Sequence, residues 1–208
     1  MRRHKGCHCS GRLEYAVSAN WVRLPVTPPF SLINRLSLRP MNRVYYSLNS
    51  RHREARLLPQ EQFLFPLDAI GGWNRLYGPN GFYQYQSVVP PDAAREATAA
   101  MLQAIAESGE GSVLAVLKTF GPRPASGLLS FVQPGVTLAL DFSRRPATSR
   151  LFDRLDAIVA AAGGRLYLAK DARMPRSLFE ASYSGLEQFL RYRDPGMSSA
   201  MSRRLMGS

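Results

Sequence analysis

The sequence predicts an α+β fold built on the split βαβ, or ferredoxin-like, arrangement. In this arrangement an antiparallel sheet carries its helices on one face, and here an irregular N-terminal arm comes before it. From residue 82 onward, stretches with the period-two alternation of strands and stretches with helical periodicity follow one another in the order β-α-β-β-α-β. Ahead of them, residues 21–62 hold five prolines, which interrupt long helices and strands. We therefore expect a basic, proline-rich arm at 1–62 and a compact α+β domain at 63–208.

Glycines and prolines mark the ends of the predicted elements. Pro90-Pro91-Asp92 is typical of a helix start, and Gly109 and Gly163 each follow a helical stretch. Two further helices are expected after the last strand, and the tail after Pro195 is small and basic. The elements expected in order are a strand at 82–89, a helix at 92–108, strands at 112–120 and 135–142, a helix at 147–162, a short strand at 163–170, and helices near 175–182 and 184–193.

The alternation within the strands separates two faces of the sheet. In the strand at 135–142, Leu138, Leu140 and Phe142 suit the face that packs on the helices. Thr137, Ala139 and Asp141 fall on the other face, which we expect to be open and mildly polar. If Gln84, Gln86 and Lys118 share this face, polar groups from distant parts of the chain meet there. The alternative is an ordinary solvated face of a half-exposed sheet.

The stretch at 163–173 is expected to deliver a lysine to the same place. Leu166, Leu168 and Ala169 suit the interior of a sheet, and Lys170, Asp171 and Arg173 follow. A lysine at the end of a buried strand needs an anion or an acceptor, because its stem cannot carry the charge far into water. The alternative is a common strand-end ion pair between Lys170 and Asp171.

The region before residue 82 is less regular. Residues 12–18 alternate like a strand, and residues 67–77 suggest a buried turn of helix that ends at Gly78. Between the prolines, apolar residues from 32 to 45 are interleaved with arginines. We expect either an irregular excursion packed on its own domain or an amphipathic segment on a membrane surface.

Composition narrows the possible partners. The 208 residues carry a net charge of +12, and much of the excess lies in arginines 35, 39, 43, 51, 53 and 56. No signature of a nucleic-acid-binding module is present, so a nucleic acid is not expected as a partner. His4, Cys7, His8 and Cys9 match no strong zinc spacing, and no metal is expected. With two cysteines, no secretory signal and no apolar run of about 20 residues, we expect a cytoplasmic protein, with peripheral membrane contact as an option.

Several blocks of the sequence, in order, resemble the substrate domain of FAD-linked oxidases of the vanillyl-alcohol oxidase superfamily. Within it they are most similar to the aldonolactone oxidase group and its decaprenylphosphoryl-ribose 2′-epimerase oxidase subunits. The resemblance covers about residues 20–205. The matching blocks are Phe65–Asp68, Trp73–Gly78, Phe82–Pro90, Val116–Arg123, Leu129–Phe131, Pro134-Gly135, Gly163–Arg173 and Met201–Leu205.

The resemblance implies oxidation of a CH–OH group in a sugar or polyol-type substrate, with hydride transfer to FAD. It implies that Lys170 lies at the N1/C2-carbonyl edge of the flavin and Tyr167 against the cofactor, and that Gln84, Gln86, Lys118 and Thr137 line the substrate pocket. Such a fixed cation would stabilise the negative charge of the reduced ring. All three histidines lie outside the expected sheet, so Lys118 or a residue of another domain must take the hydroxyl proton.

The sequence also departs from this family. Nothing in it resembles the N-terminal FAD-binding domain, so FAD is expected to be held mainly by a domain that is missing or lies on a separate chain. Thr137 stands where the epimerase oxidases carry asparagine, and Ala139 where they carry cysteine. The His-Trp-x-Lys ending of sugar-lactone oxidases is absent, which favours a polyol or sugar alcohol over a lactone. The alternatives are a non-catalytic basic module that binds an anionic surface and a truncated remnant that no longer folds.

Overall fold

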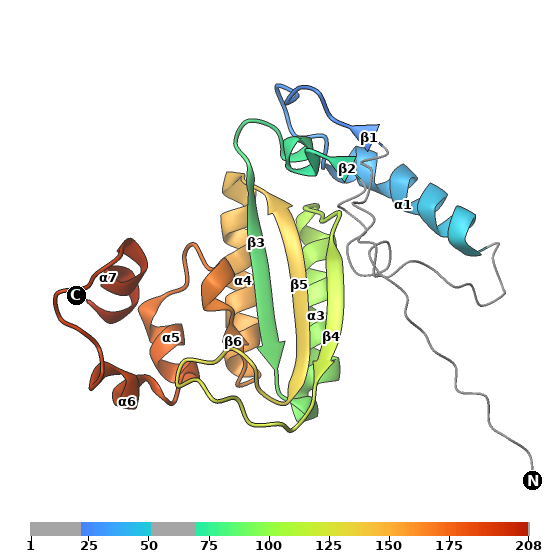
Figure 1. Cartoon of the computed structure of the whole chain (residues 1–208). Helices are drawn as coiled ribbons and strands as arrows, with labels where there is room; N and C mark the ends of the chain where they lie inside the picture. The colour runs from blue at the N-terminus through green and yellow to red at the C-terminus, as the bar shows by residue number, and fades with distance from the viewer. Residues whose placement is uncertain (1–21, 51–69, 208) are drawn as a thin grey trace, which may run out of the picture. The chain divides into compact units, whose positions relative to one another are not determined.

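The computed structural model describes residues 22–50 and 70–207 (Figure 1). These residues belong to two compact units. The described part of the smaller unit contains a parallel pair of short strands, β1 (Val22–Arg23) and β2 (Ile70–Gly71). The larger unit holds the described residues 26–50 and 74–207. The expected strand at 12–18 and the expected boundary after residue 62 lie outside the described residues.

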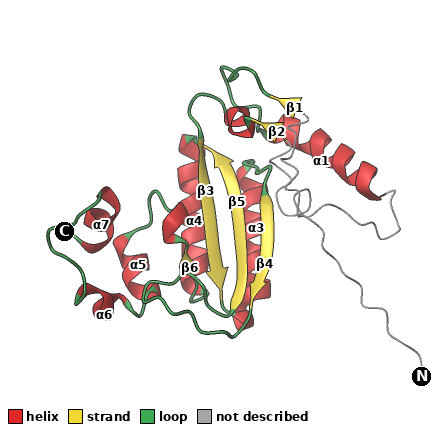
Figure 2. Cartoon of the chain, viewed as in Figure 1, coloured by secondary structure: helices red, strands yellow, loops and turns green. Residues whose placement is uncertain are grey.

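The larger unit is organised around a four-stranded antiparallel sheet with the order β4-β5-β3-β6 (Figure 2). Taken along the chain as β3-α3-β4-β5-α4-β6, this order is that of the ferredoxin-like unit, which confirms the predicted fold class. The strands are β3 (Phe82–Val89), β4 (Ala115–Phe120), β5 (Gly135–Ser143) and β6 (Arg165–Leu166).

Helices α3 (Pro91–Ser108) and α4 (Pro146–Ala161) lie together behind this sheet (Figure 1). Both helices begin with proline in the first turn, and α3 ends at Gly109 in a left-handed conformation, as its sequence predicts. The predicted face of β5 packs on them, because Leu138, Leu140 and Phe142 are buried in one cluster with apolar residues of both helices. The helices therefore cover one face, as expected.

The C-terminal region adds three short helices, α5 (Arg176–Ser182), α6 (Leu186–Leu190) and α7 (Ala200–Met206). The first two were expected and α7 was not. Ser199 and Ser202 form a reciprocal capping box at the start of α7, and Gly207 ends it. Arg204 of α7 donates a hydrogen bond to Asp171, which ties the tail to the segment that follows β6.

The expectation of an irregular arm without long elements is wrong at α1 (Arg35–Ser50), which continues through Pro40. Asn34 accepts hydrogen bonds from the amides of Leu36 and Ser37, which caps the first turn. Pro40 then removes only one backbone hydrogen bond from a helix that has already begun. The cap, together with the burial of Ile33 and Leu38, offsets the cost of the proline.

Two further expectations change in detail. The stretch at 67–77 contains β2 and a short 3-10 helix, η2 (Trp73–Tyr77), instead of one helix, although Gly78 ends it as expected with φ +76°. Strand β6 has only two residues, so Lys170 does not stand at a strand end. It ends a 3-10 turn, η3 (Leu168–Lys170), because Asp171 accepts hydrogen bonds from two following amides and bends the chain there.

Candidate functional site

One row of predicted site residues runs across β4, β5 and β3. Lys118 is the direct partner of Thr137 in the β4–β5 register, so both side chains lie on the face opposite the helices. The Nε2 atom of Gln86 donates a hydrogen bond of 3.2 Å to the Thr137 hydroxyl. Three predicted substrate-binding residues from three strands are thus neighbours.

A second row lies one step along the same face. Gln84 Nε2 donates a hydrogen bond of 3.1 Å to Oδ1 of Asp141, and the Asp141 amide donates one of 2.9 Å to the Ser112 hydroxyl. The other carboxylate oxygen, Oδ2, is buried and makes no hydrogen bond within the described ranges. Burial raises the pKa of Asp141, although the amide of Gln84 and the charge of Lys170 oppose this. Burial therefore outweighs the two interactions that favour the charged form.

Lys170 and Tyr167 border a narrow pocket at the edge of β3. Strand β6 pairs with Ser87 and Val88 of β3, and one more backbone hydrogen bond follows, from the Tyr167 amide to the Gln86 carbonyl at 2.9 Å. Beyond this bond the chain turns away from β3. The pocket between them has a cavity volume of about 20 Å³, roughly the size of one water molecule. It is lined by four of the predicted site residues, Gln84, Gln86, Tyr167 and Lys170. Lys118 and Thr137 share the sheet face but do not line this pocket.

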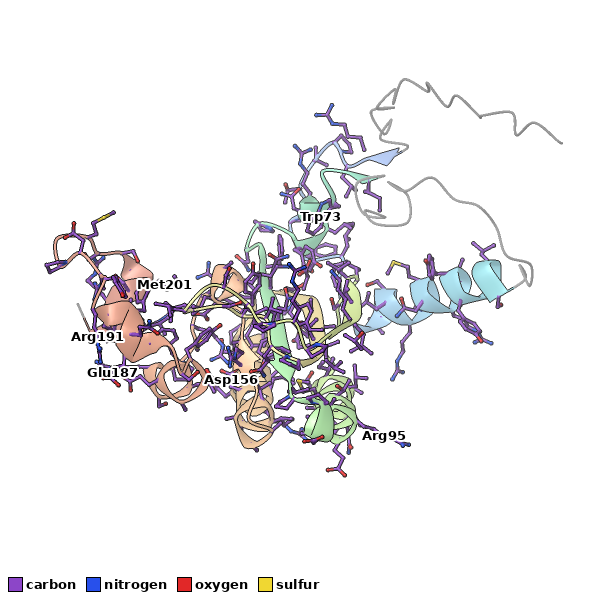
Figure 3. The ribbon with its side chains drawn as sticks, turned by 60° about the horizontal axis from the view of Figure 1, so that its bottom comes forward. Trp73, Arg95, Asp156, Glu187, Arg191 and Met201 are labelled. Carbon is purple, nitrogen blue, oxygen red and sulfur yellow. The ribbon has the colours of Figure 1, made fainter. Side chains whose placement is uncertain are left out.

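Sequence reasoning missed Asp156, a carboxylate that also lines the pocket. Asp156, labelled on α4 in Figure 3, accepts hydrogen bonds from the Tyr85 hydroxyl at 3.1 Å and from Arg173 Nη2 at 2.8 Å. Burial raises its pKa to about 6 despite the attraction of the Arg173 guanidinium. The only sequence signal was a carboxylate on the otherwise apolar face of the helix at 147–162, beside Leu155 and Val159.

The ion pair between Lys170 and Asp171, which the sequence left as the alternative, does not form. Asp171 Oδ1 accepts from the amides of Arg173 and Met174, and Oδ2 accepts from Arg204. Within residues 22–50 and 70–207, neither Lys118 nor Lys170 has an ion pair or a side-chain hydrogen bond. The two ammonium groups therefore remain available for an anion or an acceptor.

The face around Thr137 is less open than the sequence suggested. Thr137 and Asp141 are each only 1 % exposed. The β4–β5 connection contributes Phe131, whose ring packs against Phe120 and, with centroids 4.6 Å apart, against Tyr167. The expectation of an uncovered surface is therefore wrong at the centre of the sheet, and Lys118 at the β4 edge remains exposed.

Two other features of the described ranges bear on function. No helix in them is long and apolar enough to cross a membrane. They also contain no group of three or more histidine, cysteine, aspartate or glutamate side chains that could hold a metal ion. The His4–Cys9 cluster lies outside the described residues.

Comparison with known proteins relates the chain to an oxidase. No family model matches it. The chain is 37% identical over 187 residues to decaprenylphosphoryl-beta-D-ribose oxidase of Mycolicibacterium smegmatis, and the alignment covers 88% of this chain and 40% of the relative. The chain is homologous to part of that oxidase. A Streptomyces coelicolor relative, named only as an uncharacterized protein in the mprA 5′ region, is 32% identical over 197 residues, with 88% of this chain and 53% of the relative covered. The chain thus spans about half, or less, of the relatives it matches.

Proposed function

We propose that this chain is the substrate-domain portion of an FAD-dependent oxidoreductase that oxidises a CH–OH group of a sugar or polyol-type substrate by hydride transfer to flavin. The observation that carries the proposal is the homology to a ribose oxidase along 187 residues that include the polar sheet face. In the proposal, the flavin is held mainly by a further domain or a separate chain.

The amides of Gln84 and Gln86 suit a substrate rich in hydroxyl groups, because each side-chain amide offers both donors and an acceptor. Gln86 is oriented by Thr137, and Gln84 by Asp141. Both amides are therefore held in place before a substrate arrives, which lowers the entropy cost of binding it. Where the epimerase oxidases carry asparagine, Thr137 offers a single hydroxyl, so we expect a different pattern of substrate hydroxyls to be preferred.

Lys170 and Tyr167 are the described groups that fit the electron-accepting edge of a flavin. An ammonium without an ion pair, at a pocket that an aromatic side chain also lines, can stabilise negative charge that develops near it. The flavin, when bound, supplies the acceptor for a hydride. The role proposed for Lys118 is to accept, as the neutral amine, the proton of the substrate hydroxyl as the carbon–oxygen double bond forms.

The test uses the full chain with and without a flavin domain, joined to it or mixed with it. We expect the chain alone to be colourless, and the combination to be yellow and to oxidise a polyol. Lys170→Ala should lower kcat at least ~100-fold, the size expected when a preorganised electrostatic group is removed. Arg150→Ala removes an exposed charge on α4 and serves as the control. Tight flavin binding by the chain alone, or equal turnover in the two variants, would contradict the proposal.

A further inference from the structure

Helix α1 carries an apolar stripe that the other described residues of the larger unit do not cover. Met41, Val44 and Leu48 recur at helical spacing and are 45%, 59% and 56% exposed. Arg39 and Arg43 lie on the other side of the helix by the same spacing. Figure 3 shows the side chains along this helix. A helix of 16 residues thus presents apolar and basic sides together.

The first turn of α1 is firmly attached to the larger unit. Ile33 and Leu38 are buried on either side of the Asn34 cap, the arrangement of a hydrophobic staple. Arg145 donates a hydrogen bond of 3.0 Å to the Ile33 carbonyl, and Ser31 and Ser143 join their hydroxyls at 2.7 Å. The exposed stripe follows directly on this anchor, so it belongs to a formed helix with a fixed start.

Charge identifies the surface that suits this helix. The sequence contains no aspartate or glutamate from residue 15 to residue 53, whereas arginines stand at 23, 35, 39, 43, 51 and 53. A second copy of the chain would bring the same positive charges against one another. A surface that combines negative charge with an apolar layer beneath it satisfies both sides of the helix at once.

We propose that α1 binds the surface of an anionic lipid bilayer, with Met41, Val44 and Leu48 in the acyl boundary and Arg39 and Arg43 at the lipid phosphates. The helix would lie in the plane of the interface, since it is too short to span a bilayer. This inference does not rest on the proposed oxidase activity and is tested without flavin or substrate.

The experiment is co-sedimentation of the full chain with vesicles of phosphatidylcholine containing one part in three phosphatidylglycerol, and with vesicles of phosphatidylcholine alone. We expect binding to the anionic vesicles that weakens as salt is raised. Arg39→Gln with Arg43→Gln should weaken the partition coefficient about 30-fold, from about 1 kcal/mol for each arginine near the surface. Val44→Ser with Leu48→Ser should weaken it at least ~10-fold, through the loss of buried apolar area.

The control keeps the same change of net charge at another place. Arg95, which projects from α3 in Figure 3, and Arg150 of α4 are both exposed, so Arg95→Gln with Arg150→Gln should leave binding within about twofold. Thermal melts of all variants show whether each one remains folded. Equal losses in the control and the α1 variants, or equal binding to neutral vesicles, would overturn the proposal. So would self-association that disappears in Val44→Ser, because the stripe would then serve a second copy.

Discussion

The buried carboxyl of Asp156 gives the most direct quantitative test of the site. Its pKa is raised to about 6 from an ordinary value of 3.8, chiefly by burial and in spite of its contact with Arg173. As the pH rises, the unfolded chain loses this proton near pH 4, and the folded chain keeps it until about pH 6. The contribution of Asp156 to the free energy of unfolding is therefore fully present below pH 4 and is lost between about pH 4 and 6.

The size of the loss follows from the two pKa values. They differ by about 2, which corresponds to about 3 kcal/mol once the carboxyl is ionised in both states. Asp156→Asn removes the charge and keeps the shape. Its amide can accept from Arg173 and donate to the Tyr85 hydroxyl. We expect this variant to equal the wild type at pH 4 and to be more stable by up to about 3 kcal/mol at pH 8.

The assay is urea unfolding of the full chain at intervals from pH 4 to pH 8. Asp153→Asn is the control, because Asp153 also contacts Arg173, at 3.1 Å, but its side chain is 72% exposed. An exposed pair contributes little, so this variant should stay within about 1 kcal/mol of the wild type at every pH. If Asp156→Asn is less stable at pH 8, the ion pair with Arg173 outweighs the cost of burial and the reasoning is wrong. A cooperative transition would also exclude a remnant that no longer folds.

Three further changes test other parts of the molecule. Lys170→Met should raise the pKa of Asp141 further, because the lysine charge now lowers it. Carbon NMR titration of the carboxyl measures this pKa, and Lys118→Met should leave it unchanged. Equal shifts in the two variants would refute the placement of Lys170 beside Asp141. Gly135→Ala should destabilise the fold by about 2 kcal/mol or more in thermal melts, because φ is +146° and a Cβ would overlap a backbone carbonyl of β3. The control is Gly121→Ala, whose Cβ would meet no atom within 4 Å and which should be nearly neutral. Phe131→Ala should cost about 3 kcal/mol and expose the β4–β5 connection to proteolysis; resistance like that of the wild type would show that the ring does not hold it.

The sequence determined the elements whose signals are local. The strand at 82–89 has the predicted bounds, and α3 and α4 agree within one residue at each end, because alternation, proline starts and glycine stops act over a few residues. That Gln84 and Gln86 lie on the same face of the strand also followed from the period-two alternation alone. The sheet order followed from the order of the elements along the chain.

Tertiary contacts decided what the local pattern left open. Helix α1 continues past Pro40 because Ile33 and Leu38 find burial around a capped first turn, and burial depends on residues far along the chain. Lys170 leaves the strand because the side chain of Asp171 turns the backbone and pairs with Arg204, which lies 33 positions away. The site carboxyl of Asp156 is defined by partners from β3 and from the segment after η3. Sequence periodicity says which way a side chain points, but only the packed structure sets how much water it loses, and loss of water is what shifts its pKa.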